Sequence, residues 1–288
     1  MILDIFPAFV FKEVLCMNIG TFDSGLGGLL ITKSLIAAFP EYNFCYLGDT
    51  ARVPYGNRSP EVIYEYTKNC VDFLFRKCDC KLVIIACNTA TFAALRRLQQ
   101  DYLPVNFPDR RILGVIIPTA EEVAKRGYNN IGLLATVGTV FSDVYGIELS
   151  KKIKDLKFLH GVSAPLLVPL IENKGDEFAQ PIIDSYVKKF IGSGVQAIIL
   201  GCTHYPYYKK LISDSVSRIL GDDVDIISQD EFLWKYLKDY LNRHPEIESV
   251  LGRDGRNKFM VTDINDSYVA QAKILFGDSN IRIEKVEL

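Results

Sequence analysis

Two cysteines stand in nearly equivalent settings, 115 residues apart (202 − 87). Cys87 follows the apolar run 82–86 and precedes Asn-Thr, and Cys202 follows the apolar run 197–201 and precedes Thr-His. Each run predicts a strand that ends at the thiol, and the residues after it predict a turn into a helix. Two thiols placed in this way can hold one substrate between them. The arrangement suits a reaction that needs an acid on one face of the substrate and a base on the other.

Small polar residues follow five of the predicted strands. In parallel α/β proteins, ligand-binding groups collect on such loops, and donors at helix N-termini favour a carboxylate. The candidate binding residues are Asp23, Ser24, Pro54, Tyr55, Gly56, Cys87, Asn88, Thr89, Thr136, Cys202, Thr203 and His204. These loops predict a small anionic ligand.

Three further side chains are candidates for proton transfer. His204 lies two residues beyond Cys202, and Asp23 ends a strand next to Ser-Gly. Glu172 follows an apolar segment and is either a cleft acid or a solvated loop residue. Each has an ordinary alternative, since a lone cysteine or histidine often packs in a core and an Asp before Ser-Gly often caps a turn. The matching thiol loops favour the functional interpretation.

The sequence does not predict a cofactor or a metal. There is no Gly-Lys-Ser/Thr phosphate loop, and Leu30 stands where the third glycine of a dinucleotide motif beginning at Gly25 would belong. Cys78 and Cys80 form a close pair, but no second Cys or His pair stands at ligand spacing. We therefore expect neither a nucleotide cofactor nor a metal ion.

Strand-like and helix-like segments alternate along almost the whole chain, which predicts parallel sheets covered by helices on both faces. The pattern repeats: Asn18-Ile-Gly resembles Asn130-Ile-Gly, and Cys87 and Cys202 lie at similar distances beyond these segments. The repeat predicts two similar parallel-sheet α/β domains that face each other, with the active site at their interface. A chance match of short strands is the alternative.

The expected domain division follows from this repeat. We predict an N-terminal extension over residues 1–16, a first domain over 17–112 plus 223–288, and a second domain over 113–222. The strand expected at 112–117 begins the second unit, and the strand expected at 224–227 begins the return to the first. The extension is apolar but short and interrupted, so it predicts neither a membrane span nor a signal peptide. An upstream start, a packed arm and a regulatory extension remain open.

Composition narrows the class of partner. The 288 residues include 33 basic and 35 acidic side chains, a near balance that gives no sign of binding to nucleic acid or to a membrane. A small-molecule substrate is the better expectation. Seven cysteines at irregular spacing, without a convincing secretory signal, predict a reducing cytoplasm.

Several motifs together resemble those of the glutamate racemase family, in the aspartate/glutamate racemase superfamily. The resemblance runs from about Asn18 to the C-terminus, with the motifs in the family's order. The segments that carry it are Phe22–Gly28, Gly48–Gly56, Ala86–Ala90, Leu133–Thr139, Val168–Glu172 and Leu200–Pro206.

The resemblance implies a cofactor-independent enzyme that converts L-glutamate into D-glutamate for peptidoglycan. It implies that Cys87 and Cys202 are the acid/base pair, that Asp23 assists the first thiol, and that His204 and Glu172 assist the second. The first cysteine would deprotonate the D-isomer and the second the L-isomer. It further implies a homodimer or a monomer, and a peptidoglycan precursor as a possible activator.

Three positions depart from the family pattern, and two rival functions stay open. Thr119, Gln229 and Asp263 stand where related sequences usually carry other residues, mostly small ones. A racemase for aspartate would use the same thiol pair. A two-domain amino-acid-binding protein, in which both cysteines only pack, is the non-enzymatic alternative.

Overall fold

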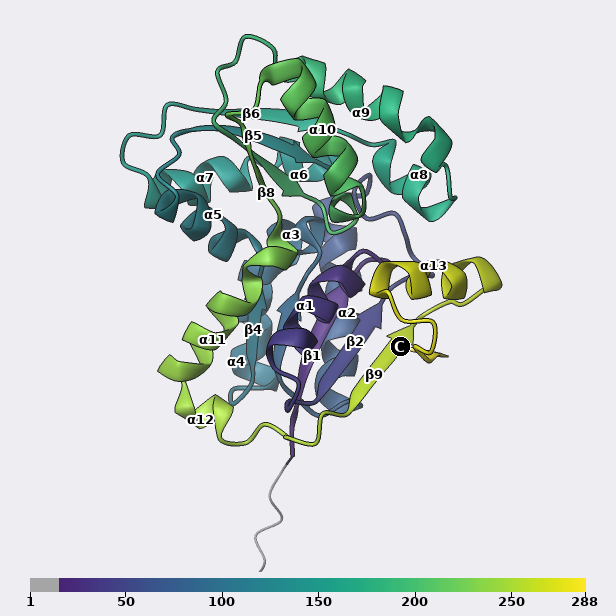
Figure 1. Cartoon of the computed structure of the whole chain (residues 1–288). Helices are drawn as coiled ribbons and strands as arrows, with labels where there is room; N and C mark the ends of the chain where they lie inside the picture. Colours follow the sequence, from purple (N-terminus) through teal and green to yellow (C-terminus); the bar gives the residue numbers. More distant parts are fainter. Residues whose placement is uncertain (1–15) are drawn as a thin grey trace, which may run out of the picture.

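The computed structural model describes residues 16–288, and its strands form two separate parallel sheets (Figure 1). The first has the order β10-β9-β2-β1-β3-β4, and the second has the order β6-β5-β7-β8. The first sheet consists of β1 (Asn18–Asp23), β2 (Phe44–Gly48), β3 (Cys80–Ile85), β4 (Arg111–Gly114), β9 (Asn257–Val261) and β10 (Ile283–Lys285). The second consists of β5 (Asn130–Ala135), β6 (Phe158–Ser163), β7 (Ala197–Gly201) and β8 (Asp225–Ile227). The predicted fold class, α/β with two parallel sheets, is confirmed.

Helices cover both faces of each sheet. They are α1 (Gly28–Ala38), α2 (Pro60–Arg76), α3 (Asn88–Arg97), α4 (Leu103–Asn106), α5 (Ile116–Lys125), α6 (Val137–Phe141), α7 (Val144–Lys152), α8 (Leu167–Glu172), α9 (Ala179–Val187), α10 (Lys209–Leu220), α11 (Leu233–Arg243), α12 (Pro245–Glu248) and α13 (Asp266–Phe276). Short helical turns are η1 (Leu98–Tyr102), η2 (Asp176–Phe178), η3 (Lys188–Phe190), η4 (Tyr205–Tyr208) and η5 (Gln229–Glu231).

The sequences of the central strands β3 and β7 are almost entirely apolar because both of their faces are buried. In β3, Leu82 and Ile84 pack with α1 and α11, whereas Val83 and Ile85 pack with α2 and α3. Successive side chains of a strand point to opposite faces, so a strand covered on both sides needs an unbroken apolar run rather than an alternating one. The same logic holds for β7, which packs against α9 and α10 on one face and α5 and α7 on the other.

The two sheets place their thiols at equivalent positions. Gly20 in β1 pairs with Val83, and Cys87 lies four residues further along the chain. Gly132 in β5 pairs with Ile198, and Cys202 again lies four residues further. The repeat recognised in the sequence therefore coincides with equal strand register in the two sheets.

Strand pairing differs from expectation at two places. The strand expected to begin the second unit is β4, and it pairs with β3 of the first sheet, after which α5 begins at Ile116. The strand expected to begin the return is β8, and it pairs with β7 of the second sheet. The chain returns to the first sheet through α11, which descends beside β4 in Figure 1. A short apolar strand can pair at either sheet edge, and its tertiary neighbours decide which.

Among residues 16–288, no helix is long and apolar enough to cross a membrane. The predicted extension, except for Cys16, lies outside the described residues. Within the part of the chain that the structure describes, no cluster of three or more His, Cys, Asp or Glu side chains could hold a metal ion.

Candidate active site

The two thiols line one cavity of about 220 Å³. Cys87 reaches it from the end of β3 and Cys202 from the end of β7, so the cavity lies between the carboxyl ends of the two sheets. Every predicted site residue except Asp23 lines this cavity. Besides the two thiols these are Ser24, Pro54, Tyr55, Gly56, Asn88, Thr89, Thr136, Glu172, Thr203 and His204. Asp23 is the exception, because it is fully buried behind this wall.

Cys87 occupies the N-cap position of α3. Its sulfur accepts a hydrogen bond from the Ala90 backbone N–H at 3.3 Å, and its thiol donates to Ser24 Oγ at 3.4 Å. Burial and then the negative charge of Asp23 raise the pKa of Cys87 to about 12, although the bonds to Ser24 and Ala90 favour the thiolate. The thiol is therefore protonated at neutral pH when the cavity holds no substrate.

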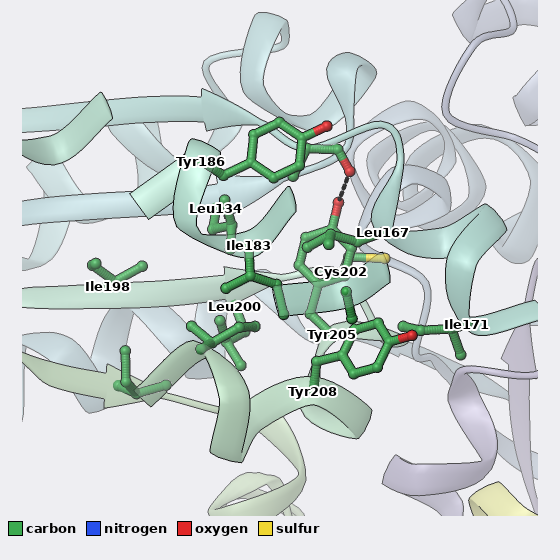
Figure 2. Close-up of a cluster of buried hydrophobic side chains, with 14 of the residues drawn as sticks. Leu134, Leu167, Ile171, Ile183, Tyr186, Ile198, Leu200, Cys202, Tyr205 and Tyr208 are labelled. Carbon is green, nitrogen blue, oxygen red and sulfur yellow. Dashed lines mark hydrogen bonds between the residues drawn. The ribbon is translucent and has the colours of Figure 1, made fainter. Parts of the chain in front are cut away.

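Cys202 lies at the edge of the core of the second sheet. Figure 2 shows its sulfur beside Leu167 and Tyr205, with Leu200 from β7 further inside the core. The Tyr205 hydroxyl donates to the Ala164 carbonyl at 2.8 Å, which ties the turn after Cys202 to the end of β6. Packing on this side holds the thiol at the cavity wall.

His204 and Glu172 form a partly buried pair beside the second thiol. His204 Nε2 lies 3.1 Å from Glu172 Oε1, and the histidine side chain is almost fully buried. Burial opposes protonation of this imidazole, but its interactions with Cys202 and Glu172 outweigh burial and raise the pKa of His204 well above its ordinary value. A cationic imidazole in this position stabilises a neighbouring thiolate. The structure thus brings together all three residues expected at the second thiol.

Asp23 connects the two thiol loops. Its Oδ1 accepts a hydrogen bond from the Thr203 hydroxyl at 3.1 Å, and its Oδ2 accepts from the Gly25 backbone N–H at 3.1 Å. Both carboxylate oxygens therefore have protein partners, and Asp23 does not line the cavity. Its geometry supports a role behind Cys87 and Thr203 rather than the direct substrate contact expected from the sequence.

The glycine-rich loop allows the second thiol loop to approach closely. A Cβ atom built on Gly27 would clash with His204 Nδ1 and lie only 2.6 Å from Thr203 Oγ1. From the sequence, this glycine-rich loop could be described only as a segment that does not match the dinucleotide-binding motif. The structure explains the glycine at position 27, because the backbone there contacts the His204 imidazole.

Three threonine hydroxyls join the helices on either side of the cavity. Thr89 Oγ1 lies 3.0 Å from Thr136 Oγ1 and 3.3 Å from Thr139 Oγ1. Thr136 also caps α6 by accepting from the Thr139 backbone N–H. Thr89 and Thr136 were predicted, whereas Thr139 was not, because its only sequence signal is its place three residues after a capping threonine.

The loop that carries Pro54, Tyr55 and Gly56 is held from behind by Asp49. This fully buried carboxylate accepts hydrogen bonds from Arg52 Nε at 2.6 Å, from the Tyr55 hydroxyl, and from Thr262 Oγ1 at 2.8 Å. The Tyr55 hydroxyl is therefore turned to Asp49, and Tyr55 lines the cavity with other atoms. Asp49 and Thr262 were missed, because 213 residues separate them in the sequence.

Two parallel α/β sheets whose carboxyl ends enclose a thiol pair, with a histidine and carboxylates behind it, define an acid–base enzyme for a small substrate. The family model for Asp/Glu/Hydantoin racemase matches residues 29–229. A glutamate racemase of Sulfurihydrogenibium sp. (strain YO3AOP1) is 35% identical over 275 residues, which cover 94% of this chain and 98% of that protein.

Solved structures agree with the sequence comparison. The glutamate racemase of Francisella tularensis, in complex with D-glutamate, superposes with a TM-score of 0.81 at 29% identity over 94% of this chain and 97% of that one. The RacE1 isoform of Bacillus anthracis glutamate racemase gives 0.81 at 30% identity over 94% and 98%. The chain belongs to the Asp/Glu/hydantoin racemase family, and within it to the glutamate racemases.

Proposed function

We propose that this chain interconverts L- and D-glutamate through Cys87 and Cys202, without a cofactor. The observation that carries the proposal is that both thiols line one cavity and occupy equivalent positions in the two sheets. Cys87 lies four residues after Val83, which pairs with Gly20, and Cys202 lies four residues after Ile198, which pairs with Gly132. One thiolate removes the α-proton from one face, and the other thiol gives a proton to the opposite face. Their protonation states exchange with each turnover. The resemblance to glutamate racemases assigns Cys87 as the base for D-glutamate and Cys202 as the base for L-glutamate.

The charges around each thiol support these roles. The raised pKa of His204 keeps a positive charge beside Cys202. Among residues 16–288, Cys87 has no such cationic partner, and burial and then Asp23 raise its pKa. Binding of the substrate ammonium group would offset the negative charge near Cys87 and lower the pKa of this thiol. General acid–base catalysis of this kind contributes roughly 10²–10⁴-fold to the rate.

The cavity walls supply donors suited to the carboxylates of glutamate. Neither Lys nor Arg lines this cavity in the part of the chain described. Apart from the cationic His204, the donors at this wall are the first backbone N–H groups of α3 and the hydroxyls of Thr89 and Thr136. Neutral donors of this kind also stabilise the charge that develops on the carboxylate during α-proton removal.

Deuterium incorporation tests the two-thiol mechanism. In D₂O, wild-type enzyme should exchange the α-proton of both L- and D-glutamate, and Cys87→Ser or Cys202→Ser should each abolish racemisation. Exchange that persists undiminished in both variants would refute the mechanism. If the α-proton of aspartate exchanges but that of glutamate does not, the substrate is aspartate. If an amino acid binds but its α-proton does not exchange, the non-enzymatic alternative is supported.

We further propose that the enzyme works in the cytoplasm and supplies D-glutamate for peptidoglycan. All seven cysteines are free thiols, which agrees with a reducing compartment. Activation by a peptidoglycan precursor through residues 1–16 is a separate proposal, motivated by the apolar composition of this segment. Deletion of residues 1–16 should abolish the response of the rate to added precursor, and an unchanged response would refute it.

A further inference from the structure

Asn88, which lines the cavity directly after Cys87, is bound to a buried glutamine from the other sheet. Gln229 follows β8, and its amide forms a reciprocal pair with Asn88. Asn88 Nδ2 donates to Gln229 Oε1 at 2.9 Å, and Gln229 Nε2 donates to Asn88 Oδ1 at 3.0 Å. Both side chains are about 97–98% buried, being 3% and 2% exposed. Asn88 and Gln229 are 141 residues apart in the sequence.

Two hydroxyls complete this buried network. The Tyr145 hydroxyl donates to Asn88 Oδ1 at 2.6 Å and lies 3.0 Å from Gln229 Nε2. Gln229 Nε2 also donates to Thr119 Oγ1 at 3.0 Å. Thr119 and Gln229, two of the three positions singled out in the sequence analysis, are therefore in direct contact.

The hydroxyl proton of Thr119 determines the orientation of the whole network. Thr119 Oγ1 donates to the Val115 carbonyl at 2.6 Å, so towards Gln229 it acts as an acceptor. Gln229 must then present its NH₂ group to Thr119 and its carbonyl oxygen to Asn88 Nδ2. Tyr145 supports the same orientation, because its hydroxyl donates to Asn88 Oδ1. The opposite orientation of either amide would place two donors or two acceptors against each other.

We propose that Gln229 is a positioning residue that makes Asn88 a hydrogen-bond donor to the substrate. This inference depends on the proposed racemase function. Asn88 Oδ1 is already bound by two donors, and one N–H of Nδ2 is used by Gln229. The second N–H of Nδ2 has no partner among residues 16–288, and Asn88 lines the cavity. It suits a carboxylate oxygen of glutamate and does not suit the ammonium group.

Steady-state kinetics with both enantiomers test this assignment. A carboxylate is charged in the ground state and in the transition state, so loss of its donor should mainly raise KM. We expect Gln229→Leu and Asn88→Ala each to raise KM for L- and D-glutamate roughly tenfold. The double variant should be no worse than Asn88→Ala alone, because one residue acts through the other. Gln99→Ala, which removes a glutamine outside the network, is the matched control.

A pair of substitutions at Thr119 separates positioning from loss of folding. Thr119→Ser keeps the hydroxyl and should keep the wild-type KM, whereas Thr119→Val has nearly the same shape and should raise KM. Thermal melting of each variant confirms that it is folded. An unchanged KM in Gln229→Leu, or independent losses that multiply in the double variant, would overturn the inference. Failure of the wild-type enzyme to racemise glutamate would instead refute the proposed function.

Discussion

The Thr203 hydroxyl donates a hydrogen bond to Asp23 Oδ1 at 3.1 Å, within the buried layer behind the cavity. This bond joins the loop of the second thiol to the strand end beside the first, across 180 residues of sequence. The two thiol loops are therefore held in relation to each other by one direct contact between a hydroxyl and a carboxylate. Asp23 thus contacts the second thiol loop and acts on Cys87 through its charge, without lining the cavity.

Removal of the Thr203 hydroxyl should weaken both the fold and catalysis. Thr203→Val leaves Asp23 Oδ1 without this donor, at a cost of about 1–3 kcal/mol in the free energy of unfolding. We expect kcat/KM to fall in both directions, because both thiol loops shift. Urea unfolding and kinetics with each enantiomer measure these effects. Thr203→Ser keeps the hydroxyl and serves as control, and equal behaviour of the two variants would contradict the role given to this bond.

Asp23 should control the pH at which Cys87 becomes reactive. Burial, and after it the Asp23 carboxylate, raise the pKa of this thiol to about 12. Only the thiolate is alkylated, so the rate of Cys87 modification by iodoacetamide should increase about tenfold per pH unit over neutral and mildly alkaline pH. Asp23→Asn removes the negative charge and should shift this profile to lower pH. Peptide mass spectrometry identifies the modified cysteine, and Cys87→Ser is the control. A profile that stays in place or moves to higher pH would disprove the interaction.

Glu172→Gln should lower the pKa of His204 and destabilise the protein in a pH-dependent way. The pKa of His204 is raised in the folded state. Its pairing with Glu172 therefore contributes its full stabilisation to the fold below pH 6.5, the ordinary pKa of histidine. This stabilisation is lost as the pH rises through the raised folded-state pKa. We expect a cost of about 2 kcal/mol near pH 6 that shrinks as the pH increases. Urea unfolding at a series of pH values measures it.

The same substitution should lower kcat/KM for L- and D-glutamate by the same factor, because the equilibrium constant between two enantiomers is one and fixes the ratio of the two values. Glu177→Gln, an exposed position near the same helix, controls for the change in net charge. If the stability difference between wild type and Glu172→Gln grew with pH, the pair would not be ionic.

The thiol loops could be predicted because their signals are local. An apolar run before Cys87 and another before Cys202 indicate strands buried on both faces, and the polar residues after them indicate loops at the same edge. Equal register in the two sheets could be anticipated from the spacing of Gly20 and Gly132 relative to the thiols. Local pattern was therefore sufficient for the part of the site that carries the chemistry.

The supporting residues could not be predicted, because their partners are distant in sequence. Asp49 binds Thr262 across 213 residues, and Asn88 binds Gln229 across 141. The sheet that receives β8 is likewise decided by contact with β7 rather than by its own three residues. Gln229 and Thr119 stood out only as departures from a family pattern, and their meaning follows from the hydrogen bond between them.

Gly27 is a position at which even one added methyl group should disturb the site. A Cβ atom there would clash with His204 Nδ1 and lie 2.6 Å from Thr203 Oγ1, both of which are buried and cannot easily move. We expect Gly27→Ala to cost about 1–3 kcal/mol in the free energy of unfolding. It should also lower kcat at least tenfold, because His204 is displaced from Cys202 and Glu172.

Gly25→Ala is the matched control, since a Cβ atom there would approach no atom closer than 3.3 Å, the distance to Glu172 Oε1. Kinetics and urea unfolding of the two variants should therefore differ clearly, with Gly25→Ala close to wild type. The pH at which His204 titrates, followed by NMR, should change in Gly27→Ala and stay constant in Gly25→Ala. Wild-type kinetics in Gly27→Ala would show that the loop can move away from His204, and that its close approach is not needed for catalysis.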